Sequence, residues 1–280
     1  MYYEFYGFKE PPFNLTPNSR FFFASQKHTE ALDSLLYAIN HRKGFIVITG
    51  EIGSGKTTVC RTLLNKLDNY TEIALITNTH LNSKDLLMTL LDDLEIDFQP
   101  GWSKAKLLSS LNSYLIGQAQ MNHNVVLIID EAQNLKPAVL EEIRMLSNLE
   151  TETEKLIQII LIGQPELKQK LALSGLEQLR QRVSVYFHLS PLVFEETREY
   201  VTHRLKIASN SNRRYFTDKA FKLIYQFSKG IPRLINQICD FAFLTGYIEE
   251  TEIIDERIMH EVIMESPMRQ FAFEKKVQNV

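Results

Sequence analysis

Short runs of apolar residues recur along the chain up to residue 190, and polar segments separate them. Each run has the length and the β-branched content of a buried strand. The run at 125–129 is continuous and apolar, which is typical of a central strand in a parallel sheet. The predicted strands comprise residues 45–49, 73–77, 125–129, 156–162 and 183–189. These runs therefore predict a sheet of parallel strands.

Before the first predicted strand and between the later ones, the apolar residues recur every three or four positions, which is the period of a helix with one buried face. The predicted helices of this region comprise residues 29–41, 57–67, 83–95, 103–120 and 137–148. From Pro191 onward only the helical period remains, and it predicts four helices with no strand between them. The sequence therefore predicts an α/β domain followed by an all-helical domain.

Aromatic and proline residues dominate the segment 5–23, which precedes the first long predicted helix. Because prolines remove backbone donors and restrict the residues before them, we expect an ordered arm packed on the α/β domain rather than a helix. The expected organisation is an arm and helix packed on the core at 1–43, an α/β core at 44–190, a helical domain at 191–266 and a polar tail at 267–280.

The composition adds little to this picture but excludes some classes of protein. With 44% hydrophobic and 23% charged residues the chain resembles an ordinary globular protein, and no apolar run reaches the length of a membrane span. The net charge of −3 gives no overall attraction to nucleic acid, although a local basic patch stays open. Cys60 and Cys239 match no metal or redox spacing and are expected to be buried thiols. Without a signal-type N-terminus, we expect a cytoplasmic protein.

One motif in the α/β region carries specific chemistry. Residues 50–57 read Gly-Glu-Ile-Gly-Ser-Gly-Lys-Thr and fit the phosphate-binding pattern G-x-x-x-x-G-K-[ST]. A predicted strand precedes the motif and a predicted helix follows it, which is the order that places a polyphosphate on the N–H groups of a helix start. A Gly/Ser turn without a ligand is the alternative, and the flanking elements disfavour it.

Each residue type in this loop has a physical role. The glycines at 50, 53 and 55 let the backbone turn and come close to the phosphates. Lys56 is placed to reach the β- and γ-phosphates, and the Thr57 hydroxyl to hold Mg²⁺. The expected nucleotide contacts are Gly50, Glu51, Ile52, Gly53, Ser54, Gly55, Lys56, Thr57, Thr58 and Asp130, with Thr57 and Asp130 as metal ligands. The expected cofactors are therefore ATP and Mg²⁺.

An acidic pair follows the strongest predicted strand. Asp130 and Glu131 come directly after the run 125–129. Asp130 lies where a carboxylate orders the water around Mg²⁺, and Glu131 is placed to polarise the attacking water as a general base. Two acids at a helix start also occur as solvated partners of the helix dipole. The phosphate-binding motif upstream favours the catalytic interpretation.

These motifs and their surroundings carry a family resemblance. The segments 50–57, 125–131, 163–167 and 230–233 together resemble those of AAA+ ATPases. The aromatic and proline-rich opening, the Asp-Glu-Ala-Gln-Asn-Leu that begins at Asp130 and the Gly-Gln-Pro-Glu-Leu of 163–167 are similar to general secretion pathway A and MSHA-type pilus biogenesis ATPases. The resemblance implies a P-loop NTPase fold of the AAA+ type, with a parallel sheet and a helical lid.

The resemblance also implies roles that no local pattern identifies. Gln164, at the tip of the predicted strand 156–162, would be a sensor that contacts the γ-phosphate or the attacking water. Arg233 would be a second sensor that reaches from the lid to the phosphates, and its pairing with the γ-phosphate would couple hydrolysis to lid motion. A solvated arginine at a helix start is the alternative for Arg233.

Two arginines, Arg180 and Arg182, precede the last predicted strand, where AAA+ proteins present an arginine finger to the neighbouring subunit. Such a residue would supply positive charge to the transition state in trans, and the sequence does not distinguish the two. Asn78, after the second predicted strand, would couple partner binding to Glu131. His28 and the aromatic arm would line the adenine pocket, unless the arm only packs against the protein.

The sequence thus predicts an Mg²⁺-dependent ATPase that works as a nucleotide-controlled homo-oligomer. The resemblance implies a role in assembling a type II secretion or type IV, MSHA-like pilus machine, with secretion or pilus proteins and an inner-membrane protein as partners. One alternative is a nucleotide-gated interaction switch with negligible turnover. Another is an ATP-dependent DNA-binding regulator of transposition, whose basic surface would comprise Arg198, Arg204, Lys206, Arg213 and Arg214.

Overall fold

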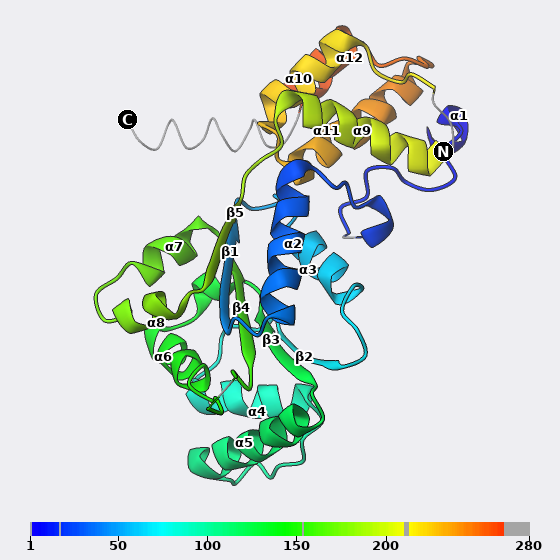
Figure 1. Ribbon diagram of the computed structural model, residues 1–280. Coiled ribbons are helices and arrows are strands. Elements are labelled where there is room, and N and C mark those ends of the chain that lie inside the picture. The colour runs from blue at the N-terminus through cyan, green and yellow to red at the C-terminus, as the bar shows by residue number, and fades with distance from the viewer. Residues whose placement is uncertain (1, 17, 153, 210–212, 266–280) are drawn as a thin grey trace. The chain divides into compact units, whose positions relative to one another are not determined.

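The computed structural model describes residues 2–16, 18–152, 154–209 and 213–265, and the expected polar tail at 267–280 lies outside them. The chain forms two compact units, whose elements are labelled in Figure 1. The α/β unit comprises Gln26–Glu51 and Val59–Leu189. The helical unit comprises Met1–Ser25, Ile52–Thr58 and Ser190–Val280, so three separate stretches of the chain assemble it.

Five parallel strands form the sheet of the α/β unit, in the order β2-β3-β4-β1-β5. The strands are β1 (Phe45–Gly50), β2 (Thr71–Ile76), β3 (Asn124–Ile129), β4 (Gln158–Gly163) and β5 (Val185–Leu189). Every residue of β1 and β4 is buried, as expected for a parallel sheet with both faces covered. The predicted fold class, a parallel α/β sheet of the P-loop type followed by helices, is confirmed.

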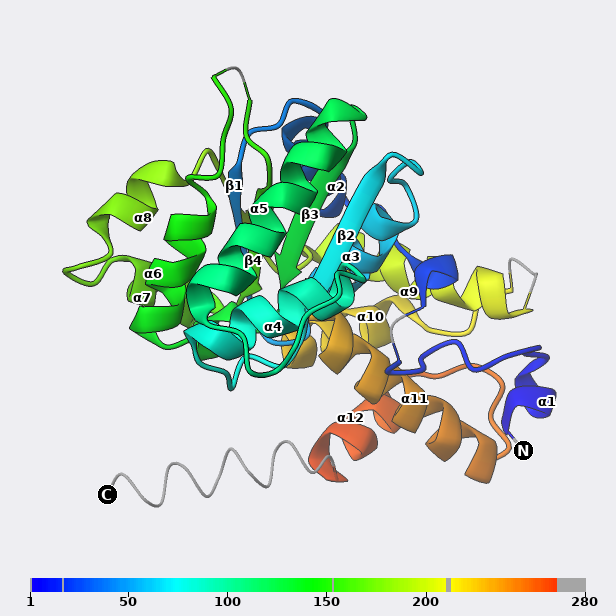
Figure 2. The same ribbon diagram turned by 90° about the horizontal axis from the view of Figure 1, so that it is seen from below.

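Helices cover both faces of this sheet (Figures 1 and 2). One face carries α2 (Gln26–Asn40) and α3 (Lys56–Leu64), and the other carries α4 (Ser83–Asp93), α5 (Lys104–Gln120), α6 (Pro137–Leu146), α7 (Pro165–Leu171) and α8 (Glu177–Arg182). Because successive strand residues point to opposite faces, Val125 and Leu127 join the core under α4–α8 while Val126 faces the other side. This burial on both faces explains the continuous apolar run of β3.

Local signals in the sequence set where these helices begin. Asn82 accepts hydrogen bonds from the N–H groups of Lys84 and Asp85 at the start of α4, and the Asp85 carboxylate accepts one from the Asn82 N–H in return. Ser103 caps α5, and Pro137 is the first residue of α6.

In the described residues, the helical unit contains four long helices and the N-terminal arm. The elements are α1 (Tyr2–Tyr6), α9 (Phe194–Ser209), α10 (Asp218–Ser228), α11 (Pro232–Ile248) and α12 (Glu256–Glu265). Phe243 of α11 is fully buried, and its ring centroid lies 4.6 Å from that of Tyr6 and 5.1 Å from that of Phe8. The arm, which we expected on the α/β core, thus packs within the helical unit because its aromatic rings bury their surface around Phe243.

Arg204 of α9 holds this arm in place. Its Nε donates to the carbonyl oxygen of Pro12 at 2.6 Å and its Nη1 donates to the Tyr200 hydroxyl at 3.1 Å. Its guanidinium also lies 4.7 Å from the ring centroid of Phe21 in η1 (Ser19–Phe21). Only 7% of Arg204 is exposed, and a buried charge needs such partners. Arg204 is therefore a structural residue, which corrects its inclusion in a basic DNA-binding surface.

Candidate nucleotide and catalytic site

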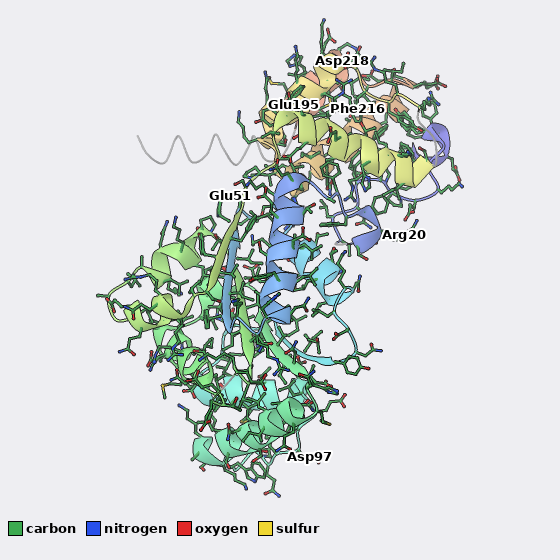
Figure 3. The ribbon with its side chains drawn as sticks, viewed as in Figure 1. Arg20, Glu51, Asp97, Glu195, Phe216 and Asp218 are labelled. Carbon is green, nitrogen blue, oxygen red and sulfur yellow. The ribbon has the colours of Figure 1, made fainter. Side chains whose placement is uncertain are left out.

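Three neighbouring strands bring predicted site residues to one edge of the sheet. β4 lies between β3 and β1, and Gly163 at the end of β4 is in register with Thr49 of β1. Because the strands are parallel, the segments that follow them leave from the same edge, where α/β proteins bind ligands. These segments begin with Glu51, which Figure 3 labels, and with Asp130 and Gln164.

The loop after β1 has the backbone that the phosphate-binding motif needs. Gly53 and Gly55 have φ angles of 79° and 99°, in the left-handed region that favours glycine. Gly50 is the last residue of β1, so the turn begins after it. α3 begins at Lys56, which is 7% exposed, and Thr57 beside it is exposed. A helix start reached through such a loop fits a polyphosphate, because its first N–H groups have no partner within the helix.

Within the helical unit, this loop touches the start of α11. The N–H of Arg233 donates to the carbonyl oxygen of Gly53 at 3.2 Å. A Cβ on Gly53 would clash with the Arg233 Cβ and lie 3.2 Å from its Cδ. The structure thus brings the predicted sensor Arg233 to the phosphate-binding loop, with its side chain exposed.

Asp130 follows β3 and lies near α3. Its N–H donates to the Ile76 carbonyl at 3.0 Å, and its Oδ1 accepts from the Glu131 N–H at 2.8 Å. Burial, with the Asp130 charge as a smaller cause, raises the pKa of the Cys60 thiol in α3 to about 12. The carboxylate of Asp130 and the hydroxyl of Thr57 are the hard oxygen donors that Mg²⁺ prefers. By chemistry these residues fit the expected metal.

Glu131 has an unusual backbone and two side-chain donors. Its φ and ψ of 53° and 35° lie in the left-handed region, just ahead of η2 (Ala132–Asn134). Its Oε2 accepts from Nε2 of Gln133 at 2.6 Å and from Nε2 of Gln164 at 3.0 Å. A non-glycine residue in this region is uncommon, and such residues cluster at functional sites. The structure therefore joins Glu131 to the predicted sensor Gln164.

Gln133 completes this group, although the sequence analysis did not identify it as a site residue. Its Oε1 accepts from the backbone N–H of Gln164 at 3.0 Å, so one side chain bridges the ends of β3 and β4. The only signal in the sequence was its place in the segment Asp-Glu-Ala-Gln. The side-chain Oδ1 of Asn78 accepts from the His80 N–H at 3.1 Å, and its coupling to Glu131 stays a prediction. Among the described residues, the side-chain donors to Glu131 are Gln133 and Gln164.

The two candidate finger residues differ in their surroundings. Arg180 lies exposed in the last turn of α8. Arg182 is half-buried near Lys155, and burial together with the Arg182 charge lowers the pKa of Lys155. Arg180 is therefore the more accessible of the two to a neighbouring molecule.

A separate basic pocket lies in the helical unit, in the region that Phe216 and Asp218 mark in Figure 3. Its cavity volume is about 290 Å³, and its lining includes Arg198, Lys206, Arg213 and Arg214, four of the five residues proposed for a DNA-binding surface. Asp218 at the start of α10 pairs with Arg198 at 2.9 Å and with Arg214 at 3.0 Å. This carboxylate partly neutralises the pocket.

The fold and the loop define the class of the protein. Residues 39–171 match the AAA domain family, and the described chain has the parallel sheet and phosphate-binding loop of that class. The chain therefore has the P-loop fold of the AAA type. It is related to general secretion pathway protein A of Aeromonas hydrophila, to which it is 42% identical over 247 residues, or 88% of the chain. The chain spans 45% of that relative's length. The resemblance seen in the sequence is thereby confirmed.

Solved structures show the same fold at low sequence identity. The ORC2 protein of Aeropyrum pernix superposes with a TM-score of 0.69 at 15% identity, over 92% of this chain and 72% of that one. Cdc6p of Pyrobaculum aerophilum gives a TM-score of 0.64 at 18% identity, over 84% and 67% of the two chains. The RuvB branch migration motor of Thermotoga maritima gives a TM-score of 0.55 at 17% identity, over 86% of this chain and 69% of that one. In the part of the chain that the structure describes, no helix combines the length and apolar composition needed to cross a membrane.

Proposed function

We propose that the chain is an Mg²⁺-dependent ATPase that hydrolyses ATP to ADP and phosphate. The observation that carries this proposal is the strand order, which puts the phosphate-binding loop, the pair Asp130-Glu131 and Gln164 after three neighbouring parallel strands. A glycine loop alone serves binding, whereas an adjacent carboxylate pair supplies the base and the metal ligand that hydrolysis needs.

Each residue then has a defined task. The N–H groups of 50–55 and the Lys56 ammonium bind the β- and γ-phosphates. Thr57 and Asp130 would hold Mg²⁺, which when bound would neutralise phosphate charge. Glu131 takes a proton from a water as its oxygen attacks the γ-phosphorus, and the bond from that phosphorus to the bridging oxygen of ADP breaks.

Three other side chains would act on the same phosphates. The Gln164 side-chain amide has two N–H donors, and one of them donates to Glu131. The other would donate to the attacking water or to the γ-phosphate. Arg233 pairs with the phosphates from the start of α11. A finger from a neighbouring subunit, Arg180 in preference to Arg182 because of its exposure, would supply transition-state charge in a homo-oligomer.

Two variants test the reaction, each with a matched control on the surface. Lys56→Ala should abolish binding of a fluorescent ATP analogue, whereas Lys66→Ala, at an exposed position just beyond α3, should not. Glu131→Gln should retain ATP and stop phosphate release, whereas the exposed Glu166→Gln should release it at the parent rate. If Glu131→Gln hydrolysed ATP as fast as the parent, the general-base assignment would be wrong.

We further propose that this ATPase serves the assembly of a type II secretion or type IV, MSHA-like pilus machine, at the inner membrane through a partner. The support is the relative named general secretion pathway protein A. In the organism that makes this protein, replacing the parent protein with the Glu131→Gln variant should abolish secretion or the formation of surface pili. Normal secretion and normal pili in that strain would overturn the assignment.

ATP-dependent DNA binding is the second candidate function, and the basic pocket favours it. Arg198, Lys206, Arg213 and Arg214 supply the positive charge that a phosphate backbone needs. One solved structure of the same fold, at 18% identity, is Drosophila ORC bound to DNA. The test is an electrophoretic mobility shift assay with duplex DNA. Binding that requires ATP, weakens as the salt concentration rises and decreases in Arg214→Ala would support this function. No mobility shift at low salt would exclude it.

A further inference from the structure

Gln133 uses both ends of its side-chain amide at the proposed catalytic centre. Its Nε2 donates to Glu131 Oε2 at 2.6 Å, and its Oε1 accepts from the Gln164 N–H at 3.0 Å. A carboxylate in place of the amide has no donor, and an aliphatic side chain has neither group. The residue type therefore matches the two partners it meets.

The two amides converge on a single oxygen of Glu131. Gln133 and Gln164 both donate to Oε2, and among the described residues Oε1 has no hydrogen-bond partner. Two donors at one oxygen fix the plane of the carboxylate and direct the other oxygen away from them. A general base needs such a fixed lone pair, because proton transfer requires hydrogen-bond distance and alignment to the water.

The surroundings fix Gln133 itself. The Lys170 ammonium of α7 donates to the carbonyl oxygen of Gln133 and, at 2.8 Å, to that of Leu135. Gly163 leaves the space for the amide, since a Cβ there would lie 2.9 Å from Gln133 Oε1 and 2.9 Å from Leu167 Cδ2. Contacts with the end of β4 thus fix the Gln133 side-chain amide, and the hydrogen bond from Lys170 fixes the Gln133 backbone.

We propose that Gln133 is a positioning residue for ATP hydrolysis, which orients the Glu131 carboxylate so that Oε1 accepts the proton of the attacking water. This inference rests on the proposed ATPase function and deepens it. In this role Gln133 needs no contact with the nucleotide or the attacking water. It acts through Glu131 and keeps that residue in register with Gln164 at the tip of the neighbouring strand.

An inhibitory role of the two amides would predict the opposite change in the rate of ATP hydrolysis. If the two amides were a latch that keeps Glu131 away from the water, removing one of them would raise the basal rate. If they position Glu131, removing one lowers kcat. The direction of the change therefore separates the two roles.

The test is steady-state ATP hydrolysis by Gln133→Met, which keeps the length of the side chain and removes both hydrogen bonds. We expect kcat to fall by about tenfold, or about 1.4 kcal/mol in the barrier, with KM and the dissociation constant for ATP within twofold of the parent. The matched control is Gln169→Met, an exposed position on α7, which should keep the parent kcat. General damage to the fold would instead change KM and the melting temperature together.

Gln164→Met and Gly163→Ala provide second variants if Gln133→Met does not fold. The first removes the other donor to Oε2, and the second crowds the Gln133 amide. Both should lower kcat, and in Gln133→Met/Gln164→Met the combined loss should differ from the product of the single losses, because the two amides share one acceptor. An active parent whose kcat is unchanged or raised in these variants refutes the positioning role alone. A parent without turnover refutes the ATPase function and this inference with it.

Discussion

The backbone N–H of Arg233 donates to the carbonyl oxygen of Gly53, so the first turn of α11 is hydrogen-bonded to the phosphate-binding loop. Both residues belong to the helical unit, which includes Ile52–Thr58 of the phosphate-binding loop. A change in the loop backbone on nucleotide binding would therefore act directly on α11. The contact gives a physical route from phosphate binding to the other helices of the helical unit.

Replacing Gly53 with alanine should break this arrangement. The left-handed backbone of Gly53 costs a residue with a Cβ about 1 to 2 kcal/mol, and the new atom would clash with the Arg233 Cβ. We expect the affinity for ATP to fall by about tenfold or more in a titration with a fluorescent nucleotide. Gly101→Ala is the control, because a Cβ there meets nothing within 4 Å. Equal affinities in the two variants would contradict the prediction.

A similar test applies to Gly230, which precedes α11. Its φ is 77°, its carbonyl accepts from the Leu192 N–H at 2.9 Å, and a Cβ would overlap the Leu192 carbonyl oxygen. Gly230→Ala should lower the free energy of unfolding by more than about 2 kcal/mol in urea titrations followed by circular dichroism. Gly117→Ala, inside α5 with open space around it, should instead raise stability by up to about 1 kcal/mol.

Mixing two inactive variants should identify the finger. A subunit with Glu131→Gln keeps its finger, and a subunit with Arg180→Ala keeps its base, so a mixed oligomer contains some complete sites. We expect each variant alone to lose on the order of a hundredfold or more in ATPase rate and the mixture to regain part of it. Arg182→Ala should keep most of the rate. Recovery with Arg182→Ala in place of Arg180→Ala would reverse the assignment, and no recovery with either would exclude catalysis in trans.

The burial of Cys60 predicts a dependence on pH. The folded thiol keeps its proton up to a pKa of about 12, whereas the unfolded one loses it near 9.0. Its contribution to stability is therefore full below pH 9 and declines as the pH rises above it. Between pH 8 and pH 10 the parent should lose about 1 kcal/mol of unfolding free energy relative to Cys60→Ala. A constant difference between the two proteins over this range would contradict the raised pKa.

The same thiols offer a simpler measurement at pH 8. Cys60 and Cys239 are both buried, and burial raises both pKa values, so very little thiolate is present in the folded protein. A thiol reagent should react with both only after unfolding. Rapid reaction of the native protein would show that one of these side chains reaches solvent.

Features that a short window of sequence determines could be predicted. The run that forms β3 is apolar because helices cover both faces, and Asp130 and Glu131 follow it directly, so strand and acidic pair were visible together. The phosphate-binding loop could also be predicted, because its motif occupies the consecutive residues 50–57. The helices α7 and α8 were not predicted, because seven and six residues are too short to show a helical period.

Features that depend on distant segments could not be predicted in this way. The role of Gln133 depends on Gln164, which lies 31 residues away in the chain and next to it in the sheet. The arm was expected on the α/β core because its sequence shows aromatic rings but not the surface that buries them. That surface belongs to Phe243 and its neighbours, near the other end of the described chain.

The helical unit is built from distant segments of the chain, and this has a consequence for synthesis on the ribosome. The α/β unit is complete once residue 189 has emerged, whereas the core around Phe243 needs α1 from the beginning of the chain and α12 from residues 256–265. At about 5 to 20 residues per second, the aromatic arm waits on the order of ten seconds or more for its partners. During that time its rings are exposed to solvent, so the nascent chain is most prone to aggregation and to chaperone binding through this arm.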